Sequence, residues 1–247
     1  MCAQPGNSNT RIVDVFAATD IGPKRKRNED RSLVRRLDGY GLLAAVADGM
    51  GGAAGGDVAA QTSMDVLGAQ DFADGPSEAA LVAALKEADR TISNLAKLTP
   101  TLEGMGTTAT VVTVHGTAAY WAHVGDSRLY HLRGGTLRQV SVDHSFLQTF
   151  LDDGSMTQEE VEKHPFRHVL DQCVGCAKCI PDAGSLELLQ GDILLLSTDG
   201  LHKVLSDKAI TDCLRSPPSL EAAVTKLIAA ALAGGGTDNI TVVALRV

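Results

Sequence analysis

The sequence predicts an α+β protein in which an antiparallel sheet assembly is covered by helices. Two observations favour this fold class. Apolar runs typical of strands follow one another in the middle of the chain, whereas the long helical patterns lie between strands that are distant in sequence. Regular alternation of strand and helix, which a doubly wound parallel sheet requires, is missing.

The individual elements follow from the period of the apolar residues. Period-two or continuous apolar runs predict strands, and apolar residues at helical spacing predict helices. The expected strands are 12–18, 42–47, 108–115, 118–124, 128–132, 193–197 and 240–247. The expected helices are 57–69, 78–98, 206–214 and 220–232. Of two glycine-rich stretches, 49–56 is interpreted as a tight turn before a helix and 234–236 as a loop before the last strand.

The length and composition fit one globular domain. The 247 residues include 44% hydrophobic residues, which suffices for a sizeable core, but only 4% are aromatic, so that core must be built from Ala, Val and Leu. We therefore expect a single domain over 1–247, with residues 1–10 flexible. A monomer is the default expectation.

The charge and the absence of targeting patterns indicate a cytoplasmic protein. The net charge of −8 disfavours nucleic-acid binding, because such a surface repels phosphates. No apolar run approaches the ~20 residues of a membrane-spanning helix, and residues 1–10 lack the apolar centre of a signal peptide. The five cysteines fit a reducing compartment better than a disulfide scaffold.

Aspartates adjoin several of the expected strands. Asp48, Asp126 and Asp199 follow apolar strands, and Asp238 precedes the last one. Each alone could cap a turn or a helix. A buried carboxylate is costly unless it is paired or binds a cation, and several at one sheet edge would repel one another without cations. Oxygen ligands select Mg²⁺ or Mn²⁺ rather than Zn²⁺, so the four together predict a metal site.

A basic run, 24–27, lies directly before Glu29 and Asp30. Such a run is usually solvated surface, but here it would place a guanidinium beside the metal site, and arginine binds phosphate in bidentate fashion. Two cations about 3.5–4 Å apart can hold a bridging water and lower its pKa. These features together predict hydrolysis of a phosphate monoester by that water, without a covalent nucleophile.

The order of the motifs resembles that of the metal-dependent protein phosphatases of the PPM (type 2C) family, in their compact bacterial single-domain form. The resemblance extends from about residue 12 to residue 247. The motifs that carry it are Gly22-x-x-Arg25-x-x-Asn28-Glu29-Asp30, Asp48-Gly49-Met50-Gly51-Gly52, Gly104-Met105-Gly106-Thr107-Thr108, Gly125-Asp126-Ser127-Arg128, Asp143-His144-Ser145, His164-Pro165-x-Arg167, Ser197-Thr198-Asp199-Gly200-Leu201 and Asp238-Asn239-Ile240-Thr241.

The resemblance implies a fold and a catalytic centre. The fold is a four-layer αββα sandwich of two antiparallel sheets, with the metal ions at one end. Arg25 would contact the phosphate of the substrate. Asp48 would bridge the two core ions, with the carbonyl of Gly49 as another ligand. Arg25, Asp48 and Asp199 are the expected catalytic residues.

The same resemblance implies the remaining ligands. Asp199 and Asp238 would complete the first metal, and Asn239 would support Asp238. Glu29 and Asp30 would bind metal-coordinated water or the second metal. A third, weaker ion is expected between Asp126 and Asp199.

Two departures from the family pattern concern catalysis and substrate choice. Met50 and Ala53 stand where relatives can have histidine, so the resemblance names no general acid. His168, Asp171 and Gln172 replace the usual residues near a mobile flap and its adjoining segment, at about 145–182. An unusual substrate preference is expected from this replacement.

A third departure is the CxxCxxC spacing of Cys173, Cys176 and Cys179. These cysteines could bind a metal or form a redox site. No fourth cysteine or ligating histidine lies nearby in the sequence. We therefore favour their interpretation as small apolar residues.

Several other polar residues have structural interpretations. His123 alternates with apolar neighbours and is expected inside the sheet, and His144 is expected to give a supporting hydrogen bond near the site. His202 follows the Asp199 motif and could face the cleft. Thr107 and Thr108 are expected to hold the start of a strand through backbone hydrogen bonds.

The expected function is removal of phosphate from phosphoserine and phosphothreonine in proteins. The expected partners are a phosphorylated protein and a separate serine/threonine kinase, in bacterial signalling such as envelope or stress control or type VI secretion. The alternatives are a phosphoprotein-binding module without activity, a hydrolase of another phosphoester, and a cysteine-ligated redox module. The presence of Arg25, Asp48, Asp199 and Asp238 favours the enzyme.

Overall fold

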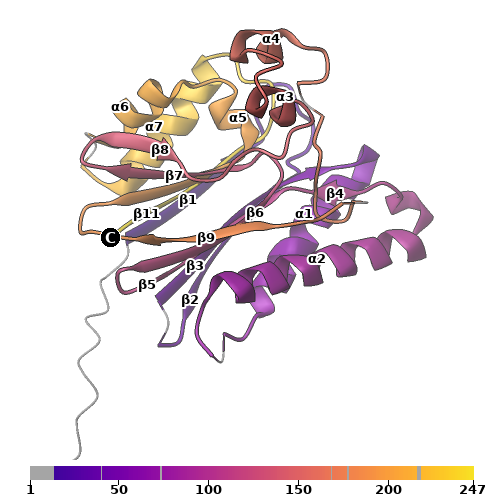
Figure 1. Ribbon diagram of the computed structural model, residues 1–247, viewed down its shortest axis with the longest axis horizontal. Coiled ribbons are helices and arrows are strands. Elements are labelled where there is room, and N and C mark those ends of the chain that lie inside the picture. The colour runs from indigo at the N-terminus through magenta and orange to yellow at the C-terminus, as the bar shows by residue number, and fades with distance from the viewer. Residues whose placement is uncertain (1–13, 40, 73, 168, 177, 216–217) are drawn as a thin grey trace, which may run out of the picture.

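Two antiparallel sheets lie face to face, and helices cover the outer face of each (Figure 1). The structure is a computed structural model that describes residues 14–39, 41–72, 74–167, 169–176, 178–215 and 218–247. This arrangement confirms the predicted αββα sandwich. The expected flexible segment 1–10 lies outside the described residues, as do residues 12 and 13 of the first expected strand.

The first sheet holds the chain's last strand next to its first described strand. Its order is β1 (Asp14–Asp20), β11 (Ile240–Arg246), β10 (Ile193–Ser197), β7 (Arg128–Arg133) and β8 (Thr136–Gln139). Helices α6 (Asp207–Arg215) and α7 (Leu220–Ala233) pack on its outer face through a cluster that includes Ile210 and Leu227.

The second sheet is covered by the two longest helices. Its order is β2 (Asp30–Leu37), β3 (Gly41–Met50), β5 (Ala109–His115), β6 (Ala118–Val124) and β9 (Asp182–Glu187), and the short β4 (Gly106–Thr107) pairs with the end of β3. The covering helices are α1 (Gly52–Ala69) and α2 (Glu78–Leu98), and a 3₁₀ turn, η1 (Pro100–Leu102), follows α2.

The central strands read as continuous apolar runs because both of their faces are buried. In β3, Leu43 and Ala45 face the helices, whereas Ala44 and Val46 face the other sheet. In β10, Leu194 likewise packs between the sheets. These strands fix the sandwich, and their ends carry the candidate site.

The expected strands and helices are all present, with shifts of a few residues at their ends. One helix boundary is wrong: α1 begins at Gly52 rather than at residue 57, so part of the glycine-rich turn is helical. Edge strands β2, β8 and β9 were missed because their sequences are largely polar. The helices α3 (Gln148–Asp152), α4 (Gln158–Lys163) and α5 (Asp199–His202) were missed because they are too short to show a period.

Within the described ranges, no helix combines the length and the apolar character needed to cross a membrane.

Candidate active site

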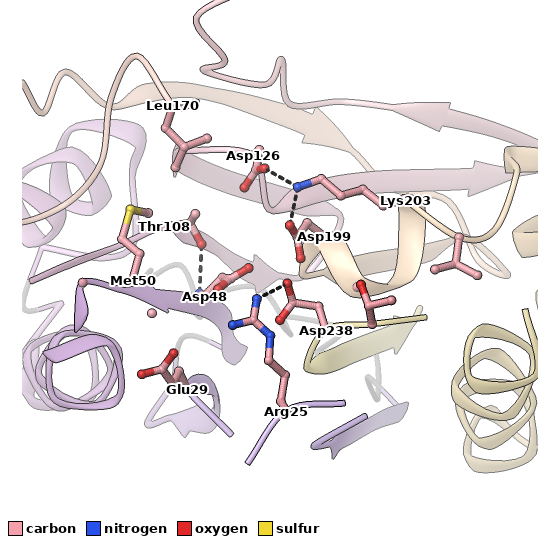
Figure 2. A pocket seen from close by; sticks show the side chains of 15 residues that line it. Arg25, Glu29, Asp48, Met50, Thr108, Asp126, Leu170, Asp199, Lys203 and Asp238 are labelled. Atoms are coloured by element: carbon pink, nitrogen blue, oxygen red, sulfur yellow. Dashed lines mark hydrogen bonds and ion pairs between the residues drawn. The ribbon is translucent and has the colours of Figure 1, made fainter. Parts of the chain in front are cut away.

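A cavity of about 680 Å³ lies at one end of the sandwich (Figure 2). The strand registers bring its walls together, since Asp30 pairs with Asp48 across β2 and β3, and Ser197 at the end of β10 pairs with Val242 near the start of β11. Of the expected site residues, those lining the cavity are Arg25, Glu29, Asp48, Gly49, Asp126, Asp199 and Asp238. Asp30 is buried in the wall, 2% exposed.

Two neighbouring threonines, Thr107 and Thr108, hold the backbone of Asp48 in place. Its backbone N–H donates to Thr108 Oγ1 at 2.9 Å. Its carbonyl oxygen accepts from the Thr108 N–H and the Thr107 hydroxyl, both at 2.9 Å. The structural role expected for Thr107 and Thr108 is therefore confirmed.

The Gly49 position depends on a close backbone contact with α1. A Cβ atom on Gly49 would lie 2.1 Å from the carbonyl oxygen of Gly56, which leaves no room for a side chain. The helix can approach the end of β3 this closely only because both residues are glycine. This contact explains why the glycine-rich stretch continues into α1.

Asn239 connects Asp238 to the loop that carries Arg25. Its side-chain amide donates to the carbonyls of Ile21 and Arg27, at 2.8 and 3.0 Å, and its Oδ1 accepts from the Glu29 N–H at 2.8 Å. Its own N–H donates to Asp238 Oδ1 at 2.9 Å. Asn239 thus supports Asp238, as the resemblance implies, and it also fixes the loop.

Arg25 lies over the cavity and pairs with Asp238. The distance from its guanidinium nitrogen to Asp238 Oδ2 is 2.6 Å, and its side chain is 49% exposed. Figure 2 shows this pair beside Asp48. Arg25 is therefore a half-exposed cation at the mouth of an acidic cavity.

Among the carboxylates predicted for the site, two oxygens have no hydrogen-bond partner within the described residues. Asp30 Oδ2 accepts from the Thr198 hydroxyl at 2.8 Å, but Asp30 Oδ1 is buried without a partner. Asp199 Oδ1 is likewise buried and unpartnered. Such oxygens are rare in folded proteins, because burial without a partner is costly. Their presence in an all-oxygen site fits a hard divalent cation.

Burial and mutual repulsion shift the acidity of these groups. Burial, followed by repulsion from Asp199 and Asp30, raises the pKa of Asp48 well above its usual value. Burial raises the pKa of Asp30 to about 7, and burial with the charge of Asp199 raises that of Asp126 to about 6. A bound cation would reverse these shifts, since it favours the charged form.

The carboxylates surround the cavity rather than converge on one point. In the described part of the chain, no three His, Cys, Asp or Glu side chains are grouped closely enough to hold one ion. Arg25 and Lys203 neutralise part of the charge here. An ion shared by three of these carboxylates would draw them closer together.

Lys203 is a site residue that the sequence analysis missed. Its Nζ lies 3.3 Å from Asp126 Oδ2 and also donates to Asp199 Oδ2 (Figure 2). The signal was present in the spacing, because Lys203 follows Asp199 by four residues, one turn of helix.

Two histidines have the structural roles expected for them. His123 is 0% exposed and hydrogen bonds to Thr110 Oγ1 at 2.8 Å. His144 Nδ1 accepts from the Gly125 N–H at 3.3 Å, and its Nε2 lies 3.1 Å from Asp182. His144 thus fixes the turn just before Asp126.

His202 does not line the acidic cavity. It hydrogen bonds to Ser197 Oγ at 3.3 Å and lines a neighbouring cavity of about 890 Å³. Met50, in contrast, lines the acidic cavity and offers no proton to a leaving group. Of the expected flap segment, Leu170 reaches the same cavity, whereas His168 lies outside the described residues.

The cysteine segment brings two of its three thiols together. Cys173 and Cys176 lie next to each other, with their Cα atoms 5.4 Å apart and their sulfur atoms in contact. Cys179 is a free thiol that packs against the apolar core between the second sheet and helices α1 and α2, and burial raises its pKa to about 12. Cys179 therefore fits the small apolar role expected for it.

With this fold and site, the chain belongs to the protein phosphatase 2C family, whose model matches residues 24–235. It is 39% identical over 236 residues to the serine/threonine protein phosphatase PstP of Mycobacterium tuberculosis. That alignment covers 95% of this chain but only 45% of the relative, so the chain spans less than half of that protein's length.

Two solved structures are similar over nearly their whole length. One is the catalytic domain of a phosphatase PstP in complex with two manganese ions, with TM-score 0.83, 36% identity, and coverage of 95% of this chain and 97% of that one. The other is PppA, described as a key regulatory component of the type VI secretion system in Pseudomonas aeruginosa, with TM-score 0.82, 33% identity, and coverage of 96% and 98%.

Proposed function

We propose that this protein is a metal-dependent phosphatase that removes phosphate from phosphoserine and phosphothreonine in proteins. The observation that carries the proposal is the cavity in which Arg25 lies among Asp48, Asp199 and Asp238. Membership of the protein phosphatase 2C family supports the same reaction. All of these functional groups are present, so a binding module without activity is disfavoured.

The carboxylates would hold two Mg²⁺ or Mn²⁺ ions. Asp48 would be shared between them, the carbonyl of Gly49 would be a further ligand, and Asp199 and Asp238 would complete the first ion. Glu29 and Asp30 would act on the second ion or on its water. When bound, such ions neutralise charge on the phosphate and lower the pKa of a coordinated water. The manganese-bound PstP structure supports this cofactor.

Arg25 would position the substrate. Its guanidinium, which pairs with Asp238 in the structure, would instead donate hydrogen bonds to two phosphate oxygens. The Asp238 carboxylate would then be free to bind the metal. Thr107 and Thr108 hold Asp48, and Asn239 holds both Asp238 and the loop of Arg25. The site is therefore built on strand ends and a tied loop, which limits reorganisation during the reaction.

The biological setting is also part of the proposal. We infer a single domain over 1–247 that acts as a monomer in the cytoplasm and reverses a separate serine/threonine kinase. Residues from about 145 to 182 would form a flap over the site and its adjoining segment. PppA supports a role in the control of secretion, since that similar protein is described as regulating such a system.

Substitution of the carboxylates tests the proposal. We expect Asp199→Ala and Asp48→Asn to abolish Mn²⁺-supported release of phosphate from a phosphothreonine peptide. Asp212→Ala is the matched control, because Asp212 pairs with Lys208 on the exposed face of α6, and it should keep full activity. Full activity of the two site variants would refute the assignment.

A further inference from the structure

Lys203 lies where the family resemblance implies a third metal ion. That ion would bind Asp126 and Asp199, and the structure brings these two side chains together around the Lys203 ammonium (Figure 2). Their side chains are only 13% and 11% exposed. The two carboxylates are therefore present, but a protein cation already joins them.

The backbone builds this arrangement. Asp199 is the first residue of α5, and the Lys203 N–H donates to the Asp199 carbonyl at 2.9 Å. One turn of helix places both side chains on the same face. The Lys203 side chain is 35% exposed and extends over the rim of the cavity to reach both carboxylates.

Because of Lys203, the two carboxylate oxygens of Asp199 have different surroundings. Asp199 Oδ2 accepts from the ammonium, whereas Asp199 Oδ1 is buried and has no hydrogen-bond partner among the described residues. The lysine thus leaves one oxygen of Asp199 available for a core ion and holds the carboxylate in that orientation. A divalent ion at the third position would have to displace the ammonium and would then be repelled by it.

We propose that Lys203 takes the place of the third metal ion, so that this protein works with two core ions and a permanent ammonium at the third position. Lys203 is then a positioning residue for Asp199. The inference rests on the proposed function, in which Asp48, Asp199 and Asp238 hold the core ions. The expected site between Asp126 and Asp199 does not fit a third ion in this chain.

Calorimetric titration of Mn²⁺ into the full chain tests the proposal. We expect wild type to bind two ions and Lys203→Asp to bind three, because the substitution removes the ammonium and adds a carboxylate. Lys208→Asp is the matched control, since Lys208 is an exposed lysine with an Asp four residues later, and it should bind two. The double variant Lys203→Asp, Asp126→Asn should return from three ions to two.

Two results would overturn the proposal. One is a wild type that binds three ions and loses one in Asp126→Asn; the other is a folded Lys203→Asp that still binds two. If circular dichroism shows that Lys203→Asp does not fold, Lys203→Gln replaces it, with a third ion again expected. Failure of the proposed function looks different: Asp48→Asn and Asp238→Asn would then leave Mn²⁺ binding unchanged.

Discussion

At the scale of single residues, Arg25 has to serve two partners. It pairs with Asp238 in the structure, and the proposed reaction requires it to bind phosphate instead. Its half-exposed position and its ties through Asn239 make this exchange a rotation of the side chain rather than a movement of the loop.

We expect Arg25→Ala to lower kcat/KM for a phosphothreonine peptide by roughly 10²–10³, the order found when one preorganised donor to a developing charge is removed. Mn²⁺ binding should persist, because the substitution removes only the guanidinium that competes with the metal ion for Asp238. Steady-state kinetics with calorimetry checks both. Lys26→Ala, one residue further along the exposed basic run, is the control and should behave as wild type. Equal losses in both variants would contradict the specific role of Arg25.

His123 predicts a defined pH dependence of stability. Burial lowers the pKa of its imidazole to about 3, whereas the unfolded chain has a histidine pKa of about 6.5. Below pH 6.5 the unfolded state binds a proton that the folded state does not. The free energy of unfolding therefore decreases as the pH is lowered from about 6.5 to about 3. This residue should contribute a slope of about 1.4 kcal/mol per pH unit.

Urea unfolding of wild type and His123→Gln between pH 4 and 7 measures that contribution. Asp30 and Asp126, whose raised pKa values act in the opposite direction, are present in both proteins and cancel in the comparison. We expect the free energy of unfolding to fall less steeply with decreasing pH in the variant. Parallel curves would mean that His123 is protonated in the folded state.

At the scale of elements, the sequence predicted what is buried on both faces and missed what is polar or short. Strands β3 and β10 were predicted from their continuous apolar runs, which arise because both faces of each strand are buried. The edge strand β9 consists only of exposed and half-buried residues and has no comparable apolar pattern. The Thr157–Glu160 capping box at the start of α4 was a usable signal for a short helix, since it satisfies two backbone groups.

The junction of β3 and β5 depends on Thr108. Its hydroxyl accepts from the Asp48 N–H and contacts Ser127 Oγ at 2.7 Å inside the protein. We expect Thr108→Val to lower the free energy of unfolding by about 1–3 kcal/mol, because a buried donor loses its partner. Denaturant unfolding in chelator checks this value. Thr113→Val is the control, since that buried hydroxyl makes only a 3.4 Å contact and should cost less.

The residues of the candidate site were predicted better than their contacts. The aspartates could be found because each adjoins an apolar strand, which is a local feature of the sequence. Lys203 could not be assigned in the same way, because its effect depends on Asp126, which comes from another strand. The contact between Cys173 and Cys176 was not predicted, because composition and spacing do not determine which thiols meet.

At the scale of the whole molecule, the sandwich concentrates negative charge at one end and leaves it partly uncompensated. The hydrogen-bonded registers of the two sheets fix the strand ends, so carboxylates that repel one another remain close. Binding of divalent ions should relieve this repulsion and stabilise the folded state.

We expect Mn²⁺ at 100 times its dissociation constant to raise the free energy of unfolding by about 2.7 kcal/mol per site. Thermal unfolding with Mn²⁺ and with chelator measures the difference. Asp48→Asn should lose most of the Mn²⁺-dependent gain, because Asp48 is the carboxylate shared by both proposed ions. An unchanged gain in that variant would place the ions elsewhere.

We propose that this carboxylate cavity uses divalent ions to hydrolyse phosphoproteins. The most direct measurement is the rate of phosphate release from a phosphothreonine peptide as Mn²⁺ is titrated into chelator-treated protein. We expect no release without the ion and a rate that rises to saturation as the core positions fill. Release that is insensitive to chelator, or none at any Mn²⁺ or Mg²⁺ concentration, would contradict it.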